Sequence, residues 1–309
     1  MARTRLHFVG YHPAHSVQAR AVDVLAGGLA RRLGDEIEFR FDPDIGDLGH
    51  KAFELLDMVE SGRFDLCYFY SSYLADRVPE LGLFELPFQI SGREAAYALL
   101  DGDVGHRITA SIAANTGYRL LACWDNGIRH ISNARHAIRR PADCRGLSMR
   151  TARNDIHQAA FRALGFEPLF LDVKELGEAA RTGRIDAQEN PLTNIRNYGL
   201  QRYHRHITLT GHLFGISAVL ANASAHASWP RAVRDALDAA MIEATAAERR
   251  FAAEEDAICT EQLTAGGTVI TPLSDLERAC FADAVRPVVE AERAKFEPQL
   301  LAAFDAGRG

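Results

Sequence analysis

The first 70 residues alternate between short apolar runs and longer segments with helical spacing, and this alternation constrains the fold more than any other feature. Residues 6–10, 36–41 and 64–70 have the apolar character of strands, whereas residues 17–33 and 50–60 carry apolar side chains at helical intervals. The last of these runs is apolar almost throughout, as in a strand that is buried on both faces. The order strand, helix, strand, helix, strand predicts a doubly wound α/β sheet.

The remainder of the chain predicts a second lobe. Residues 118–124 read as a strand, and Asn126 and Gly127 read as a turn at which the chain leaves the first lobe. The strands and helices expected in the second lobe include residues 147–150, 155–164, 168–171, 173–181 and 206–210. Residues 216–222 are expected to form a strand that returns to the first lobe, which also has short helices at 93–100 and 104–116. The first lobe is predicted to comprise residues 1–125 and 213–250, and the second residues 126–212 and 251–309.

One long helix is expected near the carboxyl terminus, because no glycine or proline occurs between Arg231 and Gly266. Its apolar positions recur at three and four residues, and its length exceeds that of one lobe. We therefore expect two α/β lobes, each a mostly parallel sheet flanked by helices, and a helix that is longer than either lobe.

Composition excludes several kinds of partner. The 309 residues, 47% of them apolar and 25% charged, are enough to bury a core in two lobes. A net charge of −6 and scattered arginines exclude a nucleic-acid backbone as the partner. The longest apolar runs are shorter than the ~18 to 20 residues of a membrane span, so we expect any link to a membrane to be made by a partner protein.

No cofactor, metal or catalytic centre is predicted. The five cysteines are widely spaced and are interpreted as buried thiols, although a single disulfide stays possible. His204 and His206 share a face, as do His12 and His15, but no third metal ligand falls at a recognisable spacing. The sequence motifs of serine hydrolases, dinucleotide-binding loops, P-loops and zinc proteases do not occur, so we expect no enzyme.

The strongest candidate for a binding residue is Arg150. Leu147 and Met149 alternate along a short strand, and Arg150 follows at its carboxyl end. Ligands of open α/β sheets bind beyond the carboxyl ends of strands, and a guanidinium there fits a carboxylate or phosphate with two parallel hydrogen bonds.

The sequence around Arg150 resembles the substrate-binding proteins of tripartite ATP-independent periplasmic (TRAP) transporters, the DctP-like family. The motifs that carry the resemblance follow one another in order over nearly the whole chain: residues 48–49, 61–65, 78–81, 86–88, 145–150, 163–168, 175–176, 183–191 and 210–212. The resemblance implies a two-lobed fold like that of periplasmic binding proteins, in which the long helix near the carboxyl terminus braces both lobes. It also implies a binding function.

The resemblance also implies roles for single residues. Arg150 aligns with the arginine that clamps the ligand carboxylate, and Asn190 lies in a motif that contacts the ligand. Arg129 aligns less securely, and its ordinary alternative is a surface salt bridge. Asn190 is expected in a loop. Its alternative role is to cap that loop with its side chain rather than to contact the ligand. Glu189, a carboxylate beside two arginines, is interpreted as their positioning or hinge partner.

Further residues at predicted strand ends are candidates for the pocket wall, and each has an alternative role in the core. They are Tyr11, His12, Tyr70, Ser71, Trp124 and Phe214. His212 is interpreted as structural or as support behind the ligand contacts, and it completes the set of candidate ligand-binding residues.

The predicted function is capture of an organic acid anion by hinge closure and its delivery to TRAP transporter membrane subunits. One alternative is a ligand-dependent sensor partner with the same fold, and another is a cryptic enzyme that uses Glu189 or His212. The amino terminus lacks the apolar core of a secretory signal. We expect a monomeric periplasmic protein whose signal peptide is absent from this chain, with a cytoplasmic protein as the alternative. The identity of the acid stays open.

Overall fold

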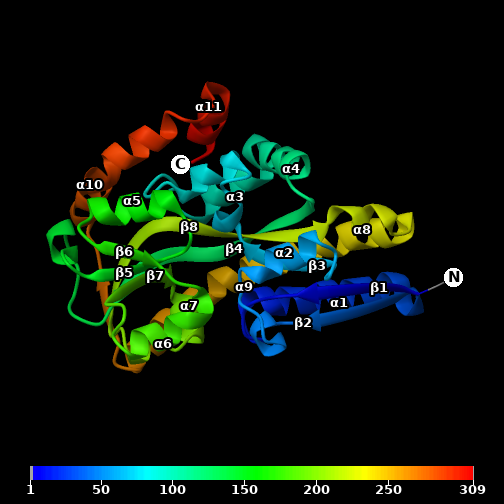
Figure 1. The fold of residues 1–309 in the computed structure, drawn as a ribbon, viewed down its shortest axis with the longest axis horizontal. Helices are drawn as coiled ribbons and strands as arrows, with labels where there is room; N and C mark the ends of the chain where they lie inside the picture. Colours follow the sequence, from blue (N-terminus) through cyan, green and yellow to red (C-terminus); the bar gives the residue numbers. More distant parts are fainter. Residues whose placement is uncertain (1–2, 309) are drawn as a thin grey trace. The chain divides into compact units, whose positions relative to one another are not determined.

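The computed structural model describes residues 3–308, which form a mixed α/β fold (Figure 1). Met1 and Ala2, with which the amino terminus discussed above begins, lie outside the described residues. Contacts within the chain divide it into two compact units. The first unit contains the residues up to Ser71, Thr109–Asp125 and Ile216–Glu255, and the second contains Ser72–Ile108, Asn126–Gly215 and the residues from Asp256 onward.

The first unit is built on the predicted alternation of strands and helices. Its elements are β1 (Thr4–Val9), α1 (Val17–Leu33), β2 (Ile37–Asp42), α2 (Glu54–Glu60), β3 (Leu66–Tyr70) and α8 (Ala223–Ser228). Strand β1 lies between β2 and β3 and is parallel to both. Helix α1 begins at its predicted place because the Ser16 side chain accepts a hydrogen bond from the Ala19 amide, and it ends at Gly34, which has a φ of 51°.

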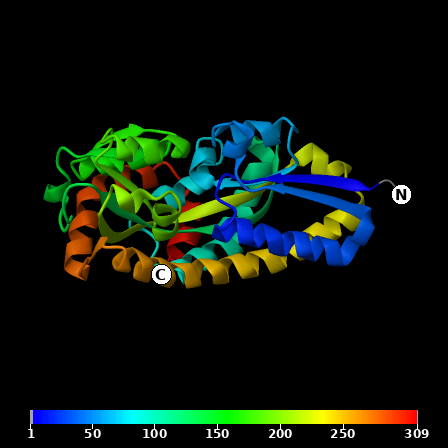
Figure 2. The same ribbon diagram turned by 90° about the horizontal axis from the view of Figure 1, so that it is seen from below.

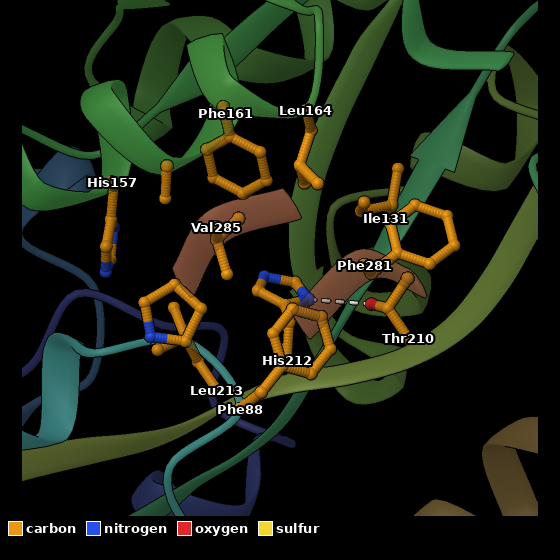
Figure 3. Close-up of a pocket in the computed structure, with 12 residues that line it drawn as sticks. Phe88, Ile131, His157, Phe161, Leu164, Thr210, His212, Leu213, Phe281 and Val285 are labelled. Atoms are coloured by element: carbon orange, nitrogen blue, oxygen red, sulfur yellow. Dashed lines mark hydrogen bonds between the residues drawn. The ribbon is translucent and has the colours of Figure 1, made fainter. Parts of the chain in front are cut away.

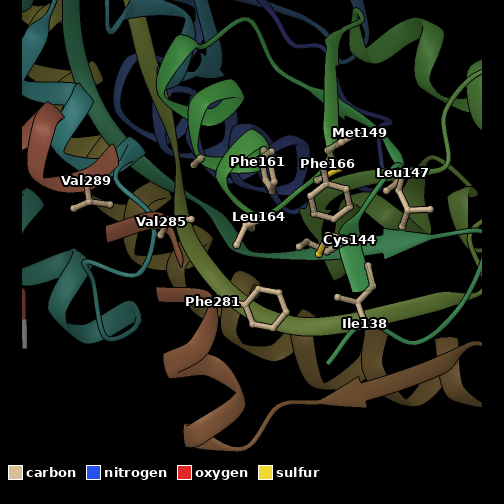
Figure 4. Close-up of a cluster of buried hydrophobic side chains, with 13 residues drawn as sticks. Ile138, Cys144, Leu147, Met149, Phe161, Leu164, Phe166, Phe281, Val285 and Val289 are labelled. Atoms are coloured by element: carbon tan, nitrogen blue, oxygen red, sulfur yellow. The ribbon is translucent and has the colours of Figure 1, made fainter. Parts of the chain in front are cut away.

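The second unit contributes further strands and helices. Its strands are β5 (Ser148–Thr151), β6 (Glu167–Phe170), β7 (Ala187–Pro191) and β9 (Val269–Pro272), and its helices are α3 (Arg93–Asp101), α5 (Asp155–Ala163), α6 (Leu176–Arg181), α7 (Leu192–Asn197), α10 (Asp275–Arg293) and α11 (Pro298–Gly307). Strand β5 is parallel to both β6 and β7. Helices α5 and α10 pack together, and Figure 4 shows Phe161 and Phe281 from these helices in one buried apolar cluster with Met149 of β5.

Four longer elements contain residues of both units. They are α4 (Asp103–Asn115), β4 (Tyr118–Asn133), β8 (His206–Asn222) and α9 (Arg231–Ala265). Figure 2 shows α9 as one uninterrupted helix, and its 35 residues confirm the long helix predicted from the sequence. Strand β3 pairs antiparallel with β8, and β7 pairs antiparallel with β4, so the sheet is mixed.

The predicted turn at Asn126 and Gly127 is wrong, because both residues lie inside β4. Gly127 has a φ of 82°, and a Cβ there would lie 2.5 Å from Cβ of Pro191 on β7. The dipeptide therefore reflects a distorted strand with close packing rather than a hairpin. Similarly, Gly211 has a φ of 53° within β8, which joins two segments that were predicted as separate strands.

Four smaller predictions also need correction. The helix expected from residue 50 begins at Glu54, and the helix expected over 173–181 is divided into a 3-10 turn, Val173–Glu175, followed by α6. Asn190, expected in a loop, lies in β7. Cys67, Cys144 and Cys259 are buried, whereas Cys280 is exposed and Cys123 only partly buried, contrary to the expectation of buried thiols.

The segment Ser72–Ile108 belongs to the second unit by its contacts, whereas the sequence patterns predict it in the first lobe. Nδ2 of Asn154 donates to Oγ of Ser72 at 2.9 Å, and the rings of Phe84 and Phe304 pack edge to face. Such contacts join residues far apart in sequence, so local patterns do not reveal them. In the part of the chain that the structure describes, no helix is long and apolar enough to cross a membrane.

Candidate ligand-binding site

Arg150 lies in β5 and is 3% exposed. Its backbone is aligned with Leu169 of β6 and Gln188 of β7, and its Nε donates to the carbonyl oxygen of Leu171 at 2.9 Å. Within residues 3–308 no acidic side chain forms an ion pair with Arg150. A buried guanidinium without a counter-ion is energetically costly, so this position favours binding of an external anion.

Arg129 differs from Arg150, because its charge is neutralised within the protein. It lies in β4 beside β7, where both it and Glu189 are buried. Its Nη2 donates to Oε1 of Glu189 at 2.8 Å, and its Nε donates to Oε2 of the same carboxylate. Nη2 also reaches the Glu189 carbonyl oxygen at 3.1 Å. The pair therefore has the two-pronged geometry of a strong buried salt bridge.

His212 lies next to this salt bridge. Its Nε2 is 3.6 Å from Oε2 of Glu189, and its Nδ1 is hydrogen-bonded to Oγ1 of Thr210 at 2.7 Å (Figure 3). Burial lowers the pKa of His212 more than Glu189 raises it. Burial by itself raises the pKa of Glu189, but Arg129 and His212 bring it well below its ordinary value. Glu189 is therefore a carboxylate and His212 a neutral imidazole at neutral pH.

Asn190 is held in place by a buried chain of amide and hydroxyl groups. Its Oδ1 accepts from Nη2 of Arg129 and from Nδ2 of Asn194, each at 3.3 Å, and its Nδ2 donates to Oε1 of Gln188 at 2.5 Å. Gln188 in turn donates to Oγ of Ser132 at 2.6 Å. These bonds engage the amide oxygen twice and leave one N–H for a ligand.

Five candidate wall residues lie in the first unit, and all of them are buried: Tyr11, His12, Tyr70, Ser71 and Trp124. The rings of Tyr11 and His12 are 4.1 Å apart between centroids, and His12 stacks on Tyr68. Trp124 is fully buried, and its Nε1 donates to Oγ1 of Thr245 on α9 at 3.0 Å. Trp124 thus has a core position in this unit.

The second unit holds the other candidates together with two residues, Tyr73 and Asp172, that no sequence pattern indicates. Phe214 is buried and packs edge to face on Tyr97. Burial raises the pKa of the Tyr73 phenol. Four charged groups also change this pKa: Arg150 and Arg129 lower it, whereas Asp172 and Glu189 raise it. Asp172 is 1% exposed. Its spacing to Glu175 indicates only a helix cap, so no local pattern places it near Arg150.

A mostly apolar cavity in the second unit adjoins the polar residues, because His212 and Thr210 also line it. Figure 3 shows Phe88, Phe161 and Phe281 among its lining side chains. It leaves about 10 Å³, on the order of one water molecule, which is too small for an organic acid. Phe88 has a φ of 60°, a strained value for a residue with a side chain, and its amide donates to the His212 carbonyl at 2.7 Å.

The two-unit α/β architecture is that of periplasmic binding proteins. The chain belongs to the bacterial extracellular solute-binding proteins of family 7, whose sequence pattern matches residues 8–295. The predicted resemblance to TRAP solute-binding proteins is thereby confirmed.

Similar proteins agree with this membership. A solute-binding protein of Verminephrobacter eiseniae is 30% identical over 92% of this chain and 82% of its own length. The 2,3-diketo-L-gulonate-binding periplasmic protein of Escherichia coli is 29% identical over 90% of this chain and 84% of its own length.

Solved structures confirm the predicted fold class. A TRAP periplasmic solute-binding protein from Bordetella, with ligand density assigned to pantoate, has a TM-score of 0.92 and 27% identity over 99% of this chain and all of its own. The sugar acid-binding protein of Advenella mimigardefordensis in complex with galactonate has a TM-score of 0.94 over 99% of this chain and 98% of its own, and at 24% identity it shows the fold alone.

Proposed function

We propose that this protein captures an organic acid anion by pairing its carboxylate with Arg150 and delivers it to the membrane subunits of a TRAP transporter. The observation that carries the proposal is the contrast between the two buried arginines. Arg129 is already paired with Glu189, whereas no described carboxylate neutralises Arg150. A ligand carboxylate supplies the missing charge, and the guanidinium can hold it with two parallel hydrogen bonds.

The similar proteins support an organic acid as the ligand. One relative is named for 2,3-diketo-L-gulonate, another from Rhodobacter capsulatus for C4-dicarboxylates, and one solved structure contains density assigned to pantoate. Each of these compounds is a carboxylate. The same relatives support periplasmic localisation, since two of them are named periplasmic proteins. Our proposal includes a monomer that undergoes hinge motion and releases the acid chemically unchanged.

The proposal is tested first by a thermal-shift screen of organic acids against the wild-type protein. A ligand that binds only the folded state raises the melting temperature. The acid with the largest effect is then titrated into wild type and Arg150→Ala by calorimetry. Loss of a buried charge pair costs ~2–5 kcal/mol, so the variant should bind roughly 30-fold to several thousandfold more weakly.

The matched control is Arg139→Ala, which removes an exposed arginine paired with Glu277. This variant should bind the acid like wild type. Unchanged affinity of Arg150→Ala would refute the clamp. Recovery of the bound acid by mass spectrometry after long incubation separates capture from turnover, because an enzyme would return a different compound.

A further inference from the structure

We propose that Asp172 makes the Arg150 site selective for a hydroxylated monocarboxylate over a dicarboxylate of the same length. This inference rests on the function proposed for Arg150 and names the class of acid that the site accepts. The hydroxyl of the ligand would donate to Oδ2 of Asp172 while the ligand carboxylate pairs with Arg150.

Asp172 follows Leu171, the residue to which Arg150 is hydrogen-bonded. Nε of Arg150 donates to the carbonyl oxygen of Leu171 at 2.9 Å, and Asp172 is the next residue. One oxygen of the Asp172 carboxylate is fixed within the protein. Its Oδ1 accepts a hydrogen bond from the Lys174 amide at 2.9 Å and so caps the turn Val173–Glu175. The carboxylate therefore has a defined orientation.

Oδ2 of Asp172 is the atom without a partner. It is buried, and among the described residues no group donates a hydrogen bond to it. Burying a carboxylate oxygen without a hydrogen-bond donor costs free energy, because the oxygen loses its hydrogen bonds to water and forms none within the protein. A ligand hydroxyl would supply the donor, whereas a ligand carboxylate offers only acceptors.

Asp172 and Arg150 share one electrostatic environment, as Tyr73 shows. The pKa of the Tyr73 phenol is raised by burial, and the charges of Arg150 and Asp172 act on it in opposite directions. Arg129 and Glu189 also act on it, but these two are paired with each other. Of the four described charged groups that act on Tyr73, Arg150 and Asp172 are the two without an ion pair within the protein.

The charge balance disfavours a second ligand carboxylate. One ligand carboxylate neutralises Arg150 and leaves the negative Asp172 to accept a hydroxyl. A second carboxylate near Asp172 would place two like charges together in a buried site, where repulsion is stronger than in water. The site should therefore discriminate between acids that differ only in the group at the far end.

The experiment uses acids matched in chain length. Lactate, D-erythronate and D-gluconate represent hydroxylated monocarboxylates, and malonate, succinate and adipate represent dicarboxylates. Thermal shift on the wild-type protein identifies the preferred acid, and calorimetry then measures its affinity and that of its matched partner. We expect the preferred acid to be a hydroxylated monocarboxylate.

The key variant is Asp172→Asn, whose side-chain oxygen still accepts from the Lys174 amide and so preserves the cap. It should bind the hydroxylated acid ~10-fold to 100-fold more weakly and reduce the preference over the dicarboxylate. Asp143→Asn is the matched control, because Asp143 also accepts backbone N–H groups, from Arg139 and Arg140, but lies in a separate turn. It should leave both affinities unchanged.

Two results would overturn the inference alone: a wild-type preference for the dicarboxylate, or equal affinities for Asp172→Asn and wild type while Arg150→Ala loses binding. In either case the function proposed for Arg150 stands. Failure of every acid in both sets to bind the wild-type protein would overturn the proposed function, and the inference with it.

Discussion

Replacing Arg129 with leucine should destabilise the protein strongly, because it leaves a buried charge without its partner. Glu189 is fully buried and receives two hydrogen bonds from the Arg129 guanidinium. Removing one member of a buried salt bridge costs ~3–5 kcal/mol. For a unit of this size, 1 kcal/mol corresponds to roughly 2 °C in melting temperature, so we expect Arg129→Leu to lower the melting temperature by about 6 to 10 °C.

The same reasoning predicts recovery when both charges are removed. The double variant Arg129→Leu with Glu189→Leu leaves no unpaired ion, and it should regain most of the lost melting temperature. Arg150→Leu should lower the melting temperature of the ligand-free protein little or not at all, because no described carboxylate depends on it. Differential scanning calorimetry measures all three variants.

The contrast between the two arginines makes this prediction refutable. An Arg129→Leu melting temperature within a degree of wild type would show that the Glu189 carboxylate does not depend on Arg129. A double variant no more stable than Arg129→Leu would show that the loss comes from packing rather than from the unpaired charge.

Two further predictions concern stability. Burial lowers the pKa of His130 to about 3 and that of His204 to about 4, below the ~6.5 of an unfolded chain, so the unfolded state binds more protons below that pH. The free energy of unfolding should therefore decrease by ~1.4 kcal/mol per pH unit for each histidine as the pH is lowered from about 6.5 to 4. His204→Asn should reduce this slope, which urea unfolding at several pH values measures. An unchanged slope would contradict the burial argument. Gly127→Ala should destabilise the protein more than Gly146→Ala, because both glycines have positive φ but only at Gly127 would the new Cβ meet Pro191. Equal urea midpoints for the two variants would show that the close approach to Pro191 costs nothing.

Local sequence patterns predicted the elements that are regular over many residues. The alternation over the first 70 residues and the segment without glycine or proline at α9 determine structure locally, so β1, α1, β2, β3 and α9 lie where expected. The turn predicted at Asn126 and Gly127 is wrong, because this dipeptide, a usual turn signal, lies here within a strand that packs against Pro191.

Only part of the candidate site could be predicted from the sequence. The position of Arg150 at the end of a short strand followed from apolar alternation, and its role followed from the family resemblance. The pairing of Arg129 with Glu189 joins residues on different strands, β4 and β7, and no local pattern encodes it. Asp172 and Tyr73 were missed for the same reason, since their proximity to Arg150 depends on tertiary packing.

The pairing of Arg150 with a ligand carboxylate is tested most directly by calorimetry that changes both partners. Wild type and Arg150→Ala are each titrated with the preferred acid and with the amide of that acid, which lacks the charge. If the carboxylate pairs with Arg150, the amide should bind wild type roughly 30-fold or more weakly than the acid, whereas Arg150→Ala should bind acid and amide almost equally. An acid-over-amide preference that is as large in Arg150→Ala as in wild type would contradict the account.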